Sequence, residues 1–258
     1  MIDNWKNIDI VDRVVHIHIP KTGGTWLNKH LNNSGVRTYD HSTIATCLSS
    51  FSQKFPCWSY DSNPSLGMNI KTQPNYDKFN SACKVAIVRN PFDWLVSYYS
   101  QKGTGVWSHH RGWDDIVNTH NIKSFEHFVH HFCDPEKRWW HVWLKRSIFY
   151  QIFNEKGEVG VDIVLKKENL TSAATKLFLD LELIKNKSEI DTNFINQTHN
   201  IKDYRTHYTP ELVDIASDFF HQELSIFGYQ FEKTNNDMSY SFAREFPNLD
   251  WGKSMQKT

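Results

Sequence analysis

The chain has 258 residues and carries 29 basic and 29 acidic side chains, so its formal net charge is zero. This balance gives no bulk attraction to nucleic acid or to an anionic membrane surface, and any anion-binding site has to be built locally. The mean hydropathy is -0.58 and no apolar run approaches the roughly 18 residues of a membrane span, so we expect neither a nucleic-acid partner nor a membrane-spanning helix.

The N-terminal segment and the cysteines bear on the cellular compartment. Residues 1–13 show no basic start followed by an apolar stretch, so no secretory signal is expected. The four cysteines match no zinc-binding spacing, and free thiols in a reducing compartment are the expectation. We therefore predict a cytoplasmic protein.

The first predicted strand, Val14–Ile19, is rich in β-branched residues and leads into a glycine turn. A helix is predicted over Thr25–Leu31, beginning inside that turn. Unpaired N–H groups at a helix start bind anions, and Gly23 and Gly24 allow the backbone to approach a ligand closely. Lys21 adds a positive charge beside them. The sequence therefore predicts an anion-binding loop after the first strand.

A second strand–turn–helix unit follows the weakly patterned, loop-rich residues 33–80. Its strand is predicted at Lys84–Val88. Asn90 is a suitable N-cap, Pro91 suits the first helical position, and Asp93 complements the helix dipole. This unit repeats the first one, a strand followed by a turn that favours anions.

Further elements are expected along the second half of the chain. Helices are predicted over 124–132, 169–183 and 209–228, and strands over 147–153, 161–167 and 229–231. The first two of these strands flank the turn-rich residues 154–160, which fits either a hairpin or a strand pair joined through a loop. Residues 238–258 show no usable period.

Strands that alternate with helices imply an α/β fold with a mainly parallel sheet covered on both sides. We predict a single P-loop-like domain over residues 1–258, with residues 1–12 and about 235–258 as peripheral extensions. Ligands of such sheets bind beyond the carboxyl ends of the strands, where both candidate turns fall.

The first loop reads "PKTGGT" and differs from the common P-loop, in which the lysine follows the glycines. It resembles the 5′-phosphosulfate loop of sulfotransferases that use 3′-phosphoadenosine 5′-phosphosulfate (PAPS). The second segment, "VRNPFDWLVSYY", resembles the 3′-phosphate motif of that family, whose arginine and serine map onto Arg89 and Ser97. Residues 161–170 and 204–231 are similar to later segments of small bacterial and carbohydrate sulfotransferases.

The resemblance implies in-line transfer of a sulfuryl group from PAPS to an acceptor hydroxyl, with adenosine 3′,5′-bisphosphate as product. Lys21 is then expected to stabilise the leaving phosphate oxygen, and no metal is required. The residues expected to bind the donor are Lys21, Thr22, Gly23, Gly24, Thr25, Trp26, Arg89, Ser97, Lys202, Tyr204 and Arg205. For Lys202, Tyr204 and Arg205 a second interpretation has nearly equal support, namely a solvent-exposed charged cluster that precedes a helix.

An acceptor hydroxyl has a high pKa, so its activation requires a general base, and histidine suits that role near neutral pH. The resemblance points to His41, which lies between the two PAPS motifs and precedes small hydroxyl-bearing residues. His109 and His110 are the alternatives, and some family members use a glutamate. His16 and His18 lie on the first strand and are expected to pack or hydrogen-bond internally.

The acceptor is expected to be a carbohydrate or glycan, with a lipid, a peptide tyrosine and a small metabolite left open. Aromatic side chains are enriched at binding surfaces, although they also fill cores. Five tryptophans fall within one region of the sequence: Trp107, Trp113, Trp139, Trp140 and Trp143.

Three other interpretations stay open. A nucleotide-dependent phosphotransferase would need magnesium, but the sequence lacks the glycine–lysine–serine/threonine order and an evident magnesium-holding aspartate. A non-catalytic nucleotide- or glycan-binding relative is disfavoured by intact Lys21, Arg89 and Ser97. Three histidines, His127, His130 and His131, have the spacing of one helix face and could bind zinc. A solvent-exposed polar face is the better interpretation, because no HExxH pattern is present.

Overall fold

The computed structural model describes residues 2–38, 81–100, 122–134, 152, 158–193, 203–232 and 240–247. The chain divides into two compact units. Unit 1 comprises Met1–Val88, Gln151–Ile195 and Met238–Leu249, and unit 2 comprises Arg89–Tyr150, Asn196–Asp237 and Asp250–Thr258. The first predicted anion loop thus belongs to unit 1. The second strand–turn–helix motif is divided, because its strand lies in unit 1 and its turn and helix lie in unit 2.

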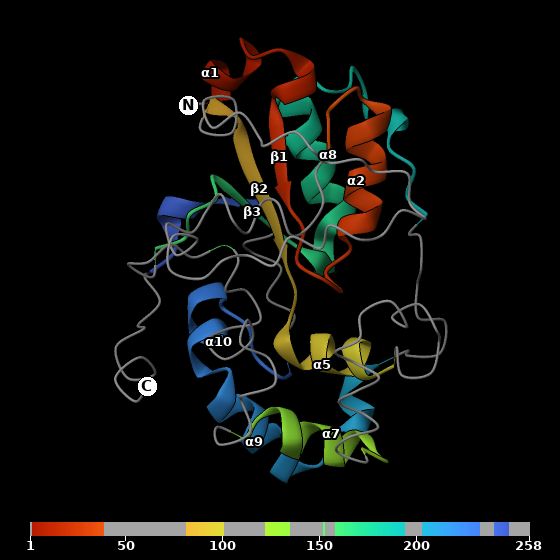
Figure 1. Cartoon of the computed structure of the whole chain (residues 1–258), viewed down its shortest axis with the longest axis vertical. Helices are drawn as coiled ribbons and strands as arrows, with labels where there is room; N and C mark the ends of the chain where they lie inside the picture. The colour runs from red at the N-terminus through yellow and green to blue at the C-terminus, as the bar shows by residue number, and fades with distance from the viewer. Residues whose placement is uncertain are drawn as a thin grey trace, which may run out of the picture. The chain divides into compact units, whose positions relative to one another are not determined.

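Unit 1 is built on a four-stranded sheet with the strand order β1-β2-β3-β4 (Figure 1). The strands are β1 (Val14–Ile17), β2 (Cys83–Val88), β3 (Ile163–Lys166) and β4 (Tyr240–Phe242). The first three are parallel, and β4 adds to β3 in the antiparallel direction. In the register, Ile17 pairs with Ala86 and Val88 pairs with Lys166, so the carboxyl ends of the parallel strands meet at one edge of the sheet.

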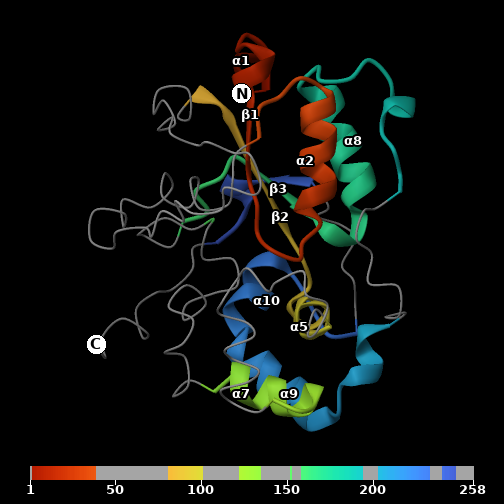
Figure 2. The same cartoon turned by 45° about the vertical axis from the view of Figure 1, so that its right-hand side comes forward.

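Two helices, α2 (Gly24–Asn33) and α8 (Leu170–Asp180), lie side by side along the sheet in both views of the molecule (Figures 1 and 2). Their apolar residues form one cluster with alternate residues of the strands, as expected for side chains that share a sheet face. The cluster includes Val14, Trp26, Leu27, Leu31, Val85, Ile87, Ile163, Leu165, Leu170, Leu177 and Phe178. Each such buried side chain contributes roughly 1.5–3 kcal/mol to folding, which fixes α2 against the sheet.

Unit 1 also has short elements at its margins: α1 (Ile2–Lys6), η1 (Ile10–Asp12), η6 (Lys167–Asn169), η7 (Lys187–Glu189) and η10 (Ala243–Glu245). Trp5 of α1 is buried in the same core cluster. The expected peripheral extensions thus take part in unit 1, the N-terminal one through Trp5 and the C-terminal one through β4.

The described part of unit 2 is helical, with α5 (Pro91–Tyr99), α7 (Phe125–Phe132), η8 (Tyr204–His207), α9 (Pro210–Phe219) and α10 (His221–Phe227). The caps follow from sequence, since Asn90 accepts a hydrogen bond from the backbone of Phe92 and Thr209 accepts one from Leu212. Aromatic rings fill the core, including Trp94 and Phe132 with ring centroids 5.8 Å apart.

The expected α/β class is confirmed, and so are the strands at residues 14–19, 84–88 and 161–167, with slightly different bounds. The helix predicted over 209–228 is wrong in its continuity, because the backbone of Phe220 (φ −98°, ψ 15°) ends α9 before α10 begins. The strand predicted over 229–231 is also wrong, since those residues adopt no strand. Conversely, β4 lies in a segment for which the sequence predicted no strand.

The strand predicted over 147–153 lies outside the described residues except for Ile152, and so do residues 154–157 of the turn that was expected to follow it. Among the described helices, none combines the length and the apolar character that a membrane span requires.

Candidate functional site

The loop between β1 and α2 has an unusual backbone. Lys21 has φ +68° and Gly23 has φ +96°, both in the left-handed region that non-glycine residues rarely adopt. Gly23 is the N-cap of α2, and its carbonyl accepts the N–H of Leu27. The N–H groups of Gly24 and Thr25 therefore lie in the first turn, where a helix offers its donors and its positive dipole end to an anion. Strain of this kind at Lys21 is characteristic of functional loops.

The two threonines of the loop have different environments. The hydroxyl of Thr22 is fully buried and donates to the carbonyl of Ile19 at 2.8 Å, so it closes the turn from inside. Thr25 is exposed at the start of α2. Of the two hydroxyls predicted to bind the donor, the structure thus places that of Thr25 at the surface and engages that of Thr22 within the loop.

Two histidines of the β1 segment support the start of α2. A Cβ atom added to Gly24 would lie 2.1 Å from Cδ2 and 2.4 Å from Nε2 of His18, so the imidazole edge lies directly against the glycine. The ring of His18 stacks on that of His16, with centroids 5.3 Å apart. His16 in turn has Nδ1 2.6 Å from Oδ1 of Asn28. The expected internal role of both histidines is confirmed, and it positions the helix start.

The opposite side of α2 is fixed to residues 190–193. The indole of Trp26 is 1% exposed and donates to the backbone carbonyl of Asp191 at 3.0 Å. Nε2 of His30 lies 3.1 Å from the same carbonyl, and burial lowers the pKa of this imidazole, which favours its neutral form. Trp26 therefore anchors α2 in the core, and its contact with the donor stays a prediction.

In unit 2, the turn before α5 brings the predicted phosphate-binding pair to one side of the helix. Nε of Arg89 donates to Oδ2 of Asp93 at 2.7 Å, in an ion pair whose side chains are 16% and 24% exposed. Asp93 and Ser97 are four residues apart and share a face of α5. Asp93 thus orients the guanidinium of Arg89, and Ser97 is buried one turn farther along α5. Binding of one phosphate by Arg89 and Ser97 stays a prediction.

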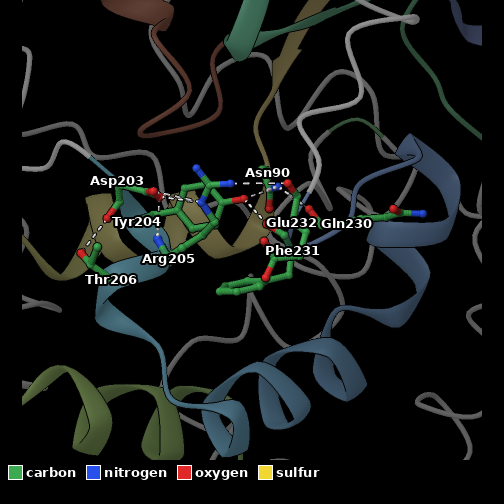
Figure 3. A network of polar contacts seen from close by, with 8 residues as sticks. All are labelled: Asn90, Asp203, Tyr204, Arg205, Thr206, Gln230, Phe231 and Glu232. Carbon is green, nitrogen blue, oxygen red and sulfur yellow. Dashed lines mark hydrogen bonds and ion pairs between the residues drawn. The ribbon is translucent and has the colours of Figure 1, made fainter.

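A polar network joins the start of α5 to η8 and to the segment after α10 (Figure 3). Asn90 is fully buried; Oδ1 accepts the N–H of Phe92, and Nδ2 donates to the carbonyl of Gln230 at 3.0 Å. The same Nδ2 lies 3.3 Å from the hydroxyl of Tyr204, which donates to the carbonyl of Phe231 at 2.5 Å. The network therefore holds Tyr204 against the residue that follows Arg89.

Arg205 is more exposed and is bound locally. Its Nε donates to Oδ1 of Asp203 at 2.8 Å, and its guanidinium lies 5.9 Å from the centre of the Tyr204 ring (Figure 3). The hydrogen bond from the Arg205 side chain lowers the pKa of Asp203, so this carboxylate is charged near neutral pH. The ion pair of Arg205 and Asp203 agrees with the alternative interpretation of this segment as a solvent-exposed charged cluster. Donor binding by Arg205 stays a prediction.

The family is decided by a match over most of the chain, because residues 7–230 fit the model of the sulfotransferase family. The chain belongs to the sulfotransferase family. The matched residues include the Lys21–Thr25 loop and the Arg89–Ser97 segment. No curated protein matches this sulfotransferase.

Several predicted residues of the sulfotransferase lie outside the described residues. They are His41 and its alternatives His109 and His110, the basic Lys202, and the five clustered tryptophans at positions 107, 113, 139, 140 and 143. On α7, His131 is buried and Nε2 of His130 lies 3.8 Å from Oε1 of Glu211. Within the ranges that the structure describes, no three His, Cys, Asp or Glu side chains gather as metal ligands.

Sequence reasoning missed two positioning contacts. Asn90 is recognisable as a helix cap, but its Nδ2 partners are 114 and 140 residues away and leave no local signal. The contact of His18 with Gly24 also leaves no local signal. The spacing of His16 and His18, two residues apart on a strand, indicates only that both rings share one face.

Proposed function

We propose that this sulfotransferase uses PAPS as its donor and transfers the sulfuryl group to an acceptor hydroxyl, that of a carbohydrate or glycan. The single observation that carries the donor assignment is the loop at the start of α2. In it, Lys21 and Gly23 both have left-handed backbone, and the first-turn N–H groups follow directly.

Two features of the loop support binding of a phosphosulfate group. At Gly24 a Cβ would overlap the His18 ring, and at Gly23 the positive φ excludes most side chains, so the backbone is kept bare at the helix start. PAPS supplies an activated sulfuryl group on its 5′-phosphate. The residues that would hold this end are Lys21, through its ammonium, and Gly23, Gly24 and Thr25, through their backbone N–H groups.

The second support comes from Arg89, just before α5, and Ser97, on α5. Arg89 is oriented by Asp93, and its planar guanidinium is suited to bidentate contact with a phosphate. Ser97 lies on the same helix face and would add a hydroxyl. A 3′-phosphate distinguishes PAPS from ATP, so these two residues would give the enzyme its preference for the donor.

The roles in the transfer follow from the residue types. His41 would take the proton of the acceptor hydroxyl while the acceptor oxygen forms its bond to sulfur. Lys21 would stabilise the electron pair that stays on the phosphate oxygen when its bond to sulfur breaks. Both roles concern charge that develops during the reaction, so their loss is expected to lower kcat more than it raises KM.

The test is transfer of radioactive sulfate from labelled PAPS to a panel of glycans, with lipid, tyrosine-peptide and small-phenol acceptors beside them. Lys21→Met and His41→Ala are each expected to lower kcat, the general-base variant by roughly 10²–10⁴-fold. Transfer to a glycan supports the proposal, and transfer to another acceptor class overturns the glycan assignment alone. Unchanged turnover in both variants would show that Lys21 does not stabilise the leaving oxygen and that His41 is not the base.

A further inference from the structure

A second lysine lies against the proposed phosphosulfate loop, contributed by a different part of unit 1. A Cβ placed on Gly23 would be 2.9 Å from Cδ and 3.2 Å from Cε of Lys167, so the stem of this lysine occupies the space beside the glycine. We propose that Lys167 binds the 5′ end of the donor together with Lys21. The inference rests on the proposed PAPS donor, and it assigns a residue that the sequence motifs leave without a role.

The position of Lys167 is fixed by the sheet. It is the first residue of η6 and directly follows Lys166, which ends β3 beside Val88 at the carboxyl edge of the parallel strands. Three residues farther on, Leu170 opens α8, and its Cδ2 is also 2.9 Å from the Cβ position on Gly23. Two side chains from the turn after β3 thus contact one glycine of the loop after β1, which gives Lys167 a defined place there.

The ammonium of Lys167 is close enough to serve the same anion as the loop. Its Cε lies 3.2 Å from the Gly23 Cβ position. Nζ follows after one carbon–nitrogen bond of about 1.5 Å, so it lies within about 4.7 Å of that position. The loop therefore has a lysine at its start and a second one against its centre.

This arrangement suits the charge of the ligand. A 5′-phosphosulfate carries negative charge on both the phosphate and the sulfonate oxygens, and one lysine provides a single compact positive charge. Because the chain has a net charge of zero, such an anion has to be met by cations gathered at the loop. Lys167, which comes from the turn after β3, would add a second positive charge to that of Lys21.

The test compares variants that separate the charge of Lys167 from the packing of its stem. Lys167→Met keeps an unbranched stem beside Gly23 and removes the ammonium, and Lys167→Arg keeps a charge. The matched control is Lys176→Met on α8, since Lys176 is exposed and paired with Asp180 at 2.7 Å. Calorimetry measures the affinity of each variant for adenosine 3′,5′-bisphosphate, adenosine 5′-monophosphate and adenosine 3′-monophosphate.

We expect Lys167→Met to bind the two 5′-phosphorylated ligands about tenfold more weakly and adenosine 3′-monophosphate with unchanged affinity. Lys167→Arg should recover most of the loss, and Lys176→Met should match the unmodified protein. An equal loss for all three ligands would indicate a purely structural role and would overturn the inference.

The test also separates this inference from the proposed function. If the unmodified protein and Lys167→Met bind the bisphosphate with equal affinity, the inference that Lys167 binds the donor is overturned, while the donor assignment stands. If the unmodified protein does not bind the bisphosphate, both fail.

Discussion

Replacing Gly24 with alanine should destabilise this sulfotransferase, although alanine is the better helix former. Gly24 is the first residue of α2, and its φ is compatible with an L side chain. The added methyl group would lie 2.1, 2.4 and 2.7 Å from Cδ2, Nε2 and Cγ of His18. The imidazole is a rigid ring that stacks on His16, so it cannot yield as the end of a flexible chain would.

The magnitude follows from two opposed effects. The helix propensity of alanine over glycine is at most about 1 kcal/mol in favour of the variant. Overpacking a well-filled site typically costs about 1–3 kcal/mol. Because three ring atoms of His18 lie within 2.7 Å, the cost of the clash is expected at the upper end of this range, which leaves a net loss of about 1–2 kcal/mol in the free energy of unfolding.

A double-mutant cycle with His18→Ala identifies the cause. In the His18→Ala background the ring is gone, so Gly24→Ala should become neutral or mildly stabilising, and the coupling energy should be about 1–3 kcal/mol. Urea unfolding followed by tryptophan fluorescence reports on this core, because Trp5 and Trp26 are buried in it. Thr25→Ala, at the exposed next position, serves as the control. An equal effect of Gly24→Ala in both backgrounds would refute the reasoning.

Two further predictions concern buried hydrogen bonds. Asn90→Ala removes the helix cap and the Nδ2 donor to Gln230 and Tyr204, and should cost about 2–4 kcal/mol in urea unfolding, whereas Asn90→Ser keeps a capping oxygen without burying a charge and should lose less. An effect of Asn90→Ala below about 0.5 kcal/mol would contradict this. Thr22→Val leaves the carbonyl of Ile19 without its donor and should cost about 1–3 kcal/mol, while Thr22→Ser should recover most of the loss; equal stability of the valine and serine variants would show that the hydroxyl does not matter.

The parts of the fold that were predictable are those set by local chemistry. Local chemistry determines the β-branched runs ending at Ile17 and Val88 and the helix cap at Asn90, because these features depend on neighbouring residues alone. The motif loops were predictable for the same reason, because glycines and a helix start lie within one short segment. Left-handed backbone at Lys21 was not foreseen, since lysine itself does not favour it.

The parts that could not be predicted depend on distant residues. Residues 229–231 have strand-like composition, but the carbonyls of Gln230 and Phe231 accept hydrogen bonds from Asn90 and Tyr204 instead of from a neighbouring strand. The break after α9 is similar, because the apolar period continues through the fully buried Phe220 while the backbone turns. Contacts of this kind are tertiary and leave no period in the sequence.

The candidate site shows the same division. Lys21 and Arg89 were identified from their motifs, and the structure adds that Asp93 holds the guanidinium of Arg89. The contact of Lys167 with Gly23 joins segments that are far apart in the sequence, so only the three-dimensional arrangement reveals it.

The most direct test of the donor assignment is calorimetric titration with adenosine 3′,5′-bisphosphate, compared with ATP in the absence and presence of magnesium. We expect the bisphosphate to bind more tightly than ATP under both conditions. Arg89→Gln should weaken its binding by about 1.5–3 kcal/mol, the contribution of a charge-assisted phosphate contact. Tighter binding of magnesium-ATP, or bisphosphate binding that does not depend on Arg89, would contradict the assignment of PAPS as the donor.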